Sequence, residues 1–226
     1  LGSRFAGQRD SCPWMREVQA DAVRPGSGHD FGGDLIPRLH ETVPVYAYDF
    51  LTNAVPGEAD GARGFWVDIG TIEAYFKASL ELVTVSPTFN LYNRHWPIRT
   101  FGSDAPPAKF VFADERSQRI GIATDSMVCE GCIISGGHIE RSVLSPRVRL
   151  NSYAHVSESI LFEGVEIGRH CRIRRTIIDK YVKVPEGTVI GYDRDEDERR
   201  FTVSPEGIVI VPKGGNLSEE GLDREA

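Results

Sequence analysis

Residues 142–191 read SVLSPRVRLNSYAHVSE, SILFEGVEIGRHCRIRR and TIIDKYVKVPEGTVIG, three consecutive segments in which similar residues return every seventeen positions. The opening triplet Ser142-Val143-Leu144 returns as Ser159-Ile160-Leu161 and then as Thr176-Ile177-Ile178. A short fixed period is typical of stacked repeat architectures. The segments are rich in β-branched residues and are separated by Gly, Pro, Asn and Asp, which favours short strands joined by tight corners over helices.

About eighteen residues make one triangular coil of a β-helix built from hexapeptides, so a period of seventeen fits a coil with one shortened corner. Such a coil buries its apolar face only against its neighbours. We therefore predict a structural β-helix from about Met127 to Gly191, with the chemistry outside it or between neighbouring copies. A closing hairpin is expected from 201–203 and 208–211, and the acidic run 193–198 is expected to form a surface turn.

The composition argues against several classes of protein. The net charge is −7, and the pI of about 5.4 argues against general affinity for nucleic acid or membrane surfaces. No apolar run approaches the ~18 residues of a spanning helix, and the N-terminus, which starts with Leu, has no signal-like apolar core. Four cysteines are few for a disulfide scaffold of 226 residues, which points to a reducing cytoplasm.

Upstream of the repeats, residues 65–84 form the clearest unit. Phe65–Ile69 predicts a strand, Gly70 a turn and Thr71 the N-cap of a helix. The apolar face of that helix is expected to consist of Ile72, Tyr75, Phe76, Leu80 and Val83. Earlier in the chain we expect a helix near 15–23, a short helix or turn near 36–40 and a strand at 43–50.

Asp68 is the most interesting acidic residue, because it follows an apolar strand and precedes a helix N-terminus. A carboxylate so placed can hold a metal bound to phosphates, while nearby backbone N–H groups favour anions. The alternative is a turn-stabilising Asp that accepts a hydrogen bond from its own backbone.

Two further groups have both a structural and a chemical interpretation. Cys129 and Cys132 have zinc or redox spacing, but no second pair follows, so small buried residues of the coil interior are favoured. His138 and His155 are seventeen apart and are expected to lie above one another, with His170 near the same level. A histidine between coils can be a general base, although exposed corner residues are the simpler interpretation.

Arginines crowd the repeat region of this acidic chain. Arg172 and Arg174 are expected to point the same way along a strand. Arginine suits phosphate and carboxylate ligands, but a solvated face or an ion-paired subunit interface is the favoured alternative. The arginines concerned are Arg141, Arg147, Arg149, Arg169, Arg172, Arg174 and Arg175.

Several blocks together resemble bacterial glucose-1-phosphate adenylyltransferases, also called ADP-glucose pyrophosphorylases. Residues 29–37, HDFGGDLIP, resemble that family's HDFGKDIIP block, and residues 65–75, FWVDIGTIEAY, match its YWRDVGT block. Further matches are WPIRT at 96–100, PPAKF at 106–110, RVRLNS at 147–152, GRHCRIRR at 168–175 and PEGTVIG at 185–191. The resemblance runs from about Gly28 to Pro212.

The resemblance implies a fold and a division of the chain. It implies an α/β remnant, the C-terminal part of a nucleotidyltransferase domain, followed by a left-handed β-helix. The expected segments are a poorly ordered or unrelated stretch at 1–27, the catalytic-domain part with its crossover at 28–110, the β-helix at 111–212 and a tail at 213–226. The family's phosphate loop, its first metal-holding Asp and its Glu-Lys pair do not occur here.

The resemblance also implies a reaction. In it glucose 1-phosphate attacks the α-phosphorus of ATP, which gives ADP-glucose and pyrophosphate for glycogen synthesis, with Mg²⁺ as cofactor. Asp68 matches the family's second metal-holding Asp, and Trp66 matches a Trp beside the active site. Gly70 belongs to the same matched block, residues 65–75, and is with Trp66 a candidate substrate contact. Sugar-phosphate or AMP effectors are implied, with Arg172, Arg174 and Lys180 as candidate contacts and Gly164 near a position where relatives have Glu.

The resemblance implies a homo-oligomer, a tetramer in the family, and no nucleic acid or membrane partner. Alone, this chain is expected to be inactive, because half of the metal site is absent. The alternatives are an oligomerisation and effector-binding module, and a hexapeptide acyltransferase with His138 or His155 as base.

Overall fold

The computed structural model describes residues 13–58, 64–100, 102, 104–114, 116–117, 119–214 and 217. The chain forms two compact units, residues 1–53 and 54–226, and each is considered by itself. This division differs from the segment limits expected from the resemblance, which stay a prediction.

The first unit is helical. It comprises α2 (Pro13–Ala22), the π-helical turn η1 (Phe31–Leu35), α3 (Ile36–Thr42) and the 3₁₀ turn η2 (Phe50–Thr52). Helices near 15–23 and 36–40 are thereby confirmed. The strand expected at 43–50 is wrong, because none of the described residues pairs with that extended segment.

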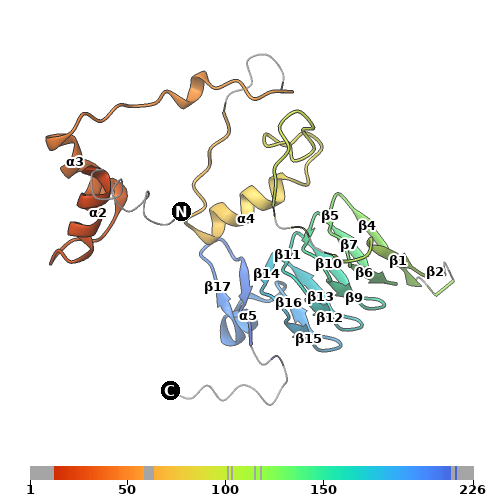
Figure 1. Ribbon diagram of the computed structural model, residues 1–226. Helices are drawn as coiled ribbons and strands as arrows, with labels where there is room; N and C mark the ends of the chain where they lie inside the picture. The colour runs from red at the N-terminus through yellow and green to blue at the C-terminus, as the bar shows by residue number, and fades with distance from the viewer. Residues whose placement is uncertain are drawn as a thin grey trace. The chain divides into compact units, whose positions relative to one another are not determined.

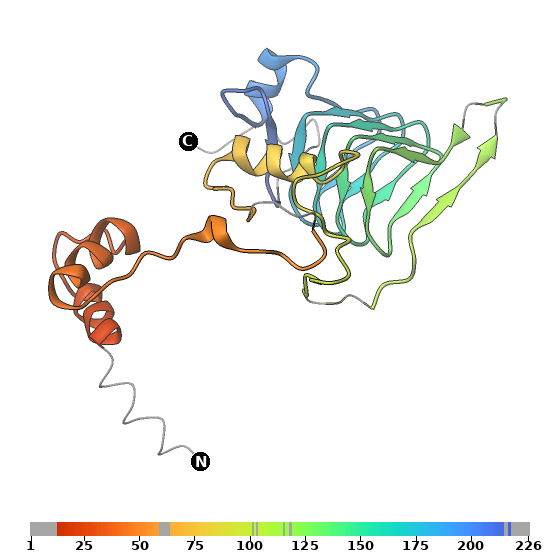
Figure 2. The ribbon, with the colours of Figure 1, turned by 90° about the horizontal axis from the view of Figure 1, so that it is seen from above.

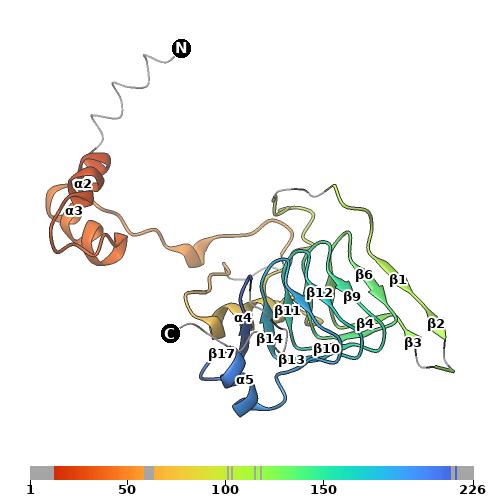
Figure 3. The same cartoon turned by 90° about the horizontal axis from the view of Figure 1, so that it is seen from below.

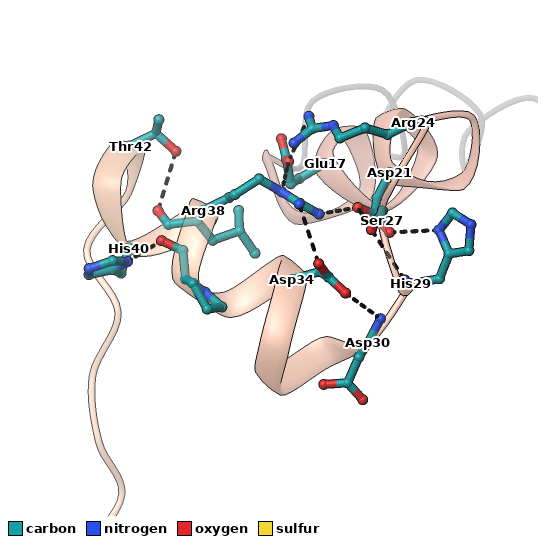
Figure 4. A network of polar contacts seen from close by, with 12 residues as sticks. Glu17, Asp21, Arg24, Ser27, His29, Asp30, Asp34, Arg38, His40 and Thr42 are labelled. Carbon is teal, nitrogen blue, oxygen red and sulfur yellow. Dashed lines mark hydrogen bonds and ion pairs between the residues drawn. The ribbon is translucent and has the colours of Figure 1, made fainter.

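A buried carboxylate holds this small unit together (Figure 4). Asp21 is only 2 % exposed, and it accepts a hydrogen bond from Ser27 Oγ at 2.7 Å and contacts His29 Nδ1 at 3.0 Å. The guanidinium of Arg38 reaches the same carboxylate and also donates to Glu17 Oε1 at 3.1 Å. The hydrogen bond from Ser27, opposed by burial and supported by His29 and Arg38, lowers the pKa of Asp21.

The second unit is built around a left-handed β-helix, whose parallel strands stack into three sheets (Figures 1 and 2). The first sheet contains β1 (Lys109–Val111), β6 (Ile133–Ser135), β9 (Arg149–Leu150), β12 (Glu166–Ile167) and β15 (Lys183–Val184). The second contains β4 (Ile122–Thr124), β7 (His138–Glu140), β10 (His155–Ser157), β13 (Arg172–Arg174) and β16 (Val189–Ile190). All five are labelled in Figure 1, and Figure 3 labels β4, β10 and β13 from another side.

The third sheet contains the last two strands of the array, β17 (Thr202–Val203) and β18 (Val209–Val211). Its parallel strands are β5 (Met127–Val128), β8 (Val143–Leu144), β11 (Ile160–Leu161), β14 (Thr176–Ile178) and β18. β17 pairs with β18 in antiparallel register, which confirms the closing hairpin. A separate two-stranded ribbon joins β2 (Ala113–Asp114) to β3 (Arg119–Ile120).

The register of the sheets confirms the seventeen-residue period. Val143 pairs with Ile160, and Ile160 pairs with Ile177. The array begins earlier than Met127, since β1 already pairs with β6. The core lies inside the coils, and its fully buried side chains include Ile134, Leu150, Ile167, Ile173 and Ile190.

The corners explain why one coil needs only seventeen residues. Arg141, Glu158 and Arg175 adopt φ values of 44°, 45° and 49°, so one corner of each coil turns on a single left-handed residue. The same corner is followed by a buried hydroxyl in three successive coils, at Ser142, Ser159 and Thr176. The repeated hydroxyl is therefore part of the turn, as the hydrogen bonds described below show.

Two helices attach to the array. α4 (Ile72–Glu81) begins at Thr71, whose Oγ1 accepts a hydrogen bond from the N–H of Ala74 at 3.1 Å, so the predicted N-cap is confirmed. Phe76 packs with Ile160, Ile177 and Ile208. Figure 2 shows α4, in yellow, beside the β-helix.

The expected turn at 193–198 is wrong, because α5 (Arg194–Arg200) forms there. Asp193 caps this helix through a 3.1 Å bond from the N–H of Glu196. The acidic first turn and the two arginines of the last turn suit the helix dipole.

Candidate functional site

The segment that carries Asp68 is extended but is not a strand. Residues 64–70 pair with no strand among the described residues, so the strand expected at 65–69 is wrong. Trp66 is 75 % exposed and Ile69 is 55 % exposed. An isolated apolar stretch has no neighbour to accept its backbone hydrogen bonds, and it therefore forms no ladder.

The Asp68 side chain stabilises the turn before α4. Its Oδ1 accepts a hydrogen bond from the N–H of Gly70 at 2.8 Å, and the residue is exposed. This geometry is the turn-stabilising interaction that competes with the catalytic interpretation. Since the second carboxylate oxygen has no partner among the described residues, the turn leaves one ligand atom available.

The described residues do not build a magnesium site around Asp68. Magnesium requires near-octahedral oxygen ligands, of which the protein usually supplies one or two carboxylates. Among the described residues, the one group of three that could hold a metal ion does not include Asp68. Asp68 stays a prediction as a catalytic and metal-binding residue, as do Trp66 and Gly70 as substrate contacts.

The candidate effector residues lie on two different parts of the coil. Arg172 and Arg174 flank the buried Ile173 on β13 and both are exposed, so their predicted common direction is confirmed. Arg172 lies 4.4 Å from the ring centre of Tyr192. Lys180 is exposed at the corner after β14, so the structure does not place it on the sheet of the two arginines.

Other arginines of the repeats are ion-paired between coils. Arg141 donates to Glu158 at 2.9 Å, and Arg147 donates to Glu163 at 2.8 Å. Arg175 lies 3.9 Å from Glu158. These three arginines are thus ion-paired within the chain, and the expected ion-paired subunit interface stays a prediction.

The predicted pair of cysteines divides in its burial. Cys132 is fully buried, which confirms it as a small core residue, whereas Cys129 is only half-buried, so the interior interpretation is wrong for it. Cys171 is a further fully buried cysteine of the array. Burial raises the pKa of the Cys132 thiol to about 11 and also raises the pKa of Cys171. A thiol so protonated at neutral pH is a poor nucleophile and a poor metal ligand. Cys12 lies outside the described residues.

His138 and His155 are register partners on β7 and β10, as expected, with ring centres 5.0 Å apart. Both are half-buried strand residues, so the corner interpretation is wrong for them. His170 does not join them, because it turns a corner at φ 57° and stacks on Tyr153. Burial, with the charges of His138 and Arg172, lowers the pKa of His155.

Sequence reasoning missed Glu140, the third member of this group. The ligand atoms of His138, Glu140 and His155 all lie within 4.8 Å of one another. The signal was present, because residues two apart on a strand share a face and Glu140 follows His138 by two.

No helix among the described residues is long and apolar enough to span a bilayer.

Comparison with known proteins agrees with the resemblance found in the sequence. Residues 106–211 match a family model described as GlmU-like, C-terminal hexapeptide. A glucose-1-phosphate adenylyltransferase of Anaeromyxobacter dehalogenans is 55 % identical over 200 residues, which cover 88 % of this chain and 48 % of the relative.

Two further proteins with the same name match a similar share of the chain. The one from Anaeromyxobacter sp. strain Fw109-5 is 51 % identical over 88 % of this chain and 48 % of its own length. The one from Parafrankia sp. is 44 % identical over 89 % of this chain and 49 % of its own length. The chain spans about half the length of the curated relatives it matches, and across nearly nine tenths of its own length it is similar to glucose-1-phosphate adenylyltransferases.

Proposed function

We propose that this chain forms the β-helix-bearing part of an enzyme that transfers an adenylyl group from ATP to glucose 1-phosphate, giving ADP-glucose and pyrophosphate for glycogen synthesis in the cytoplasm. The observation that carries the proposal is 44–55 % identity to proteins named for this activity over about nine tenths of the chain. The β-helix and the capped helix α4 are consistent with it.

In this proposal, Asp68 would supply one carboxylate ligand to a Mg²⁺ ion, which would neutralise the charge of the reacting phosphates. The turn at Gly70 fixes Asp68 directly before α4, whose first N–H groups favour anions. Trp66 offers an exposed flat ring beside this carboxylate in the sequence, suited to a base or sugar.

A pyrophosphate-release assay tests the proposal. With ATP, glucose 1-phosphate and Mg²⁺, the 226-residue chain alone should release no pyrophosphate above the enzyme-free control. A hybrid that joins this chain to the portion of the Anaeromyxobacter dehalogenans enzyme that it does not match should release pyrophosphate only when both substrates are present. Robust turnover by the chain alone would contradict the role assigned to it.

A second candidate function is assembly and effector binding by the β-helix. Arg172 and Arg174 favour it, because both are exposed on one strand and neither forms an ion pair with a described carboxylate. We infer a site for a sugar phosphate or AMP there, with Lys180 as a less direct contact, on a homo-oligomer. Calorimetry with fructose 1,6-bisphosphate and AMP tests it, with Arg174→Ala as the variant. Arg194→Ala removes an exposed arginine already paired with Glu198 and is the control.

Acyl transfer stays a prediction. The edge-to-face contact of His138 with His155 between coils is the observation that keeps it open. Loss of acyl transfer from an acyl thioester donor when both histidines become Ala would be needed to support it.

A further inference from the structure

The outward face of the second sheet brings together two imidazoles and a carboxylate. His138 and Glu140 lie on β7 with the buried Ile139 between them, so both point away from the core. His155 lies on β10, directly beside His138 in the parallel register. The two strands belong to successive coils and are labelled in Figure 1. The group is therefore fixed by the backbone and not by a mobile loop.

The geometry of this group suits a transition-metal ion. One ligand atom from each of the three residues lies within 4.8 Å of the other two. A zinc ion bound at ~2.0–2.2 Å holds its ligand atoms roughly 3–4 Å apart, so small side-chain rotations close the group around the ion. Two imidazole nitrogens with one carboxylate oxygen form a donor set typical of Zn²⁺, and one or more positions remain open.

We propose that His138, Glu140 and His155 form a binding site for a divalent transition-metal ion, Zn²⁺ or Co²⁺ in practice, that bridges successive coils of the β-helix. The site is separate from the adenylyl-transfer proposal, since it uses none of the residues assigned there. A bound ion would link β7 to β10 and stabilise the folded array by mass action.

Two neighbouring arginines affect how tightly the ion would bind, one by pairing with the Glu140 carboxylate and the other through its positive charge beside the site. Arg141 lies 3.4 Å from Glu140 and 2.9 Å from Glu158, so it keeps a carboxylate partner if Glu140 turns to the metal. Arg172 is the register partner of His155 on the next coil, and its guanidinium lies over the ring of Tyr192 at 4.4 Å. Arg172→Ala should therefore tighten metal binding, because it removes a positive charge beside the ion.

The test uses the 226-residue chain without a histidine tag, titrated with Co²⁺ by absorption spectroscopy and with Zn²⁺ by calorimetry. We expect one ion per chain and a Co²⁺ spectrum of nitrogen and oxygen ligands. His155→Asn and Glu140→Gln should each weaken binding by about tenfold or more. His170→Asn is the matched control, since this exposed histidine stacks on Tyr153 outside the group, and it should leave the affinity unchanged.

Thermal unfolding provides a readout that needs no spectroscopic ion. Zn²⁺ should raise the Tm of the wild-type chain and of His170→Asn, but not that of His155→Asn. If circular dichroism shows that His155→Asn is unfolded, His138→Gln replaces it. Failure of the wild type to bind, equal affinity in His155→Asn, or a thiolate charge-transfer band in the Co²⁺ spectrum would each overturn the proposal.

Discussion

The Oγ of Ser159 accepts a hydrogen bond from the backbone N–H of Thr176 at 3.2 Å, one coil further along the array. The same hydroxyl donates to the carbonyl of Ser157 at 2.7 Å, and the N–H of Ser159 in turn donates to Ser142 Oγ at 3.1 Å. Ser142, Ser159 and Thr176 are all fully buried. A ladder of hydroxyls therefore satisfies the backbone at this corner, where the left-handed residue before it interrupts the strand.

Breaking this ladder should destabilise the β-helix. Ser159→Ala leaves the buried N–H of Thr176 without its acceptor, which costs about 1–3 kcal/mol of unfolding free energy. Ser159→Thr keeps the hydroxyl, as the natural residue at 176 does, and should recover most of that loss. Urea denaturation followed by circular dichroism measures both. Equal destabilisation by Ala and Thr would show that packing, and not the hydroxyl, matters at this position.

Docking of α4 on the array depends on Phe76, which is 4 % exposed among Ile160, Ile177 and Ile208. Phe76→Ala removes a buried ring and should lower the unfolding free energy by about 3–5 kcal/mol. Val85→Ala is the control, because Val85 is 98 % exposed and its change should stay within about 0.5 kcal/mol. Chemical denaturation of the two variants side by side checks the difference.

Alanine substitutions at two glycines of the last coil distinguish the cost of a steric clash from the cost of backbone strain. Gly191 has φ 82°, and a Cβ there would lie 1.8 Å from the carbonyl oxygen of Arg174. Gly187 has φ 75°, but a Cβ there would meet nothing within 4 Å. Gly187→Ala should therefore cost about 1–2 kcal/mol from the left-handed backbone alone.

Gly191→Ala should cost more than about 3 kcal/mol, because the backbone must also move away from Arg174. Comparison of the melting temperatures of these two variants measures the extra cost. Similar values for both would contradict the close approach of Gly191 to the preceding coil.

The stability of the first unit should depend on pH through Asp21. Its pKa in the folded state lies below the unfolded value of 3.8, because the hydroxyl of Ser27 and the charges of His29 and Arg38 favour the ionised form. The sign follows from linkage: the stabilisation is present above pH 3.8 and is lost as the pH falls through the folded pKa.

Hydrogen–deuterium exchange of residues 13–42 checks this prediction. Protection of α2 and α3 should decline below about pH 4 in the wild type. Asp21→Asn should show lower protection at pH 7 and little further decline in acid. A wild-type decline that persists unchanged in Asp21→Asn would assign the effect to other carboxylates.

The repeat region could be predicted from the sequence because its fold is set by local, periodic interactions. The apolar residues that recur at positions such as 150 and 167 fill the interior, and the seventeen-residue spacing is the register itself. The repeat pattern did not reveal β1, because Lys109 pairs with Ile133, which lies 24 positions further on (133 − 109) and therefore outside the seventeen-residue period. Thr71 was also found, since an N-cap depends on residues next to it in the sequence.

The expected strands failed for a physical reason. Phe65–Ile69 has strand composition, but a strand needs a neighbour, and the described part of this chain supplies none. The acidic run at 193–198 was read as a turn because charge indicates exposure, yet Asp197 is 3 % exposed and accepts a hydrogen bond from the N–H of Gly191 at 2.9 Å. Glu140 was missed because the seventeen-residue spacing links residues on successive coils, whereas Glu140 shares its face with His138 along a single strand.

The most direct test of the central claim is the effect of Asp68→Asn on pyrophosphate release by the hybrid enzyme, with Asp49→Asn as the matched control. Both aspartates are exposed and accept a hydrogen bond from the N–H two residues on, at 2.8 Å from Gly70 and 3.1 Å from Leu51. If Asp68 holds a metal ion that neutralises the reacting phosphates, kcat should fall on the order of 100-fold or more in Asp68→Asn and stay unchanged in Asp49→Asn. Equal, small effects of the two substitutions would contradict the account, because Asp68 would then serve only its turn.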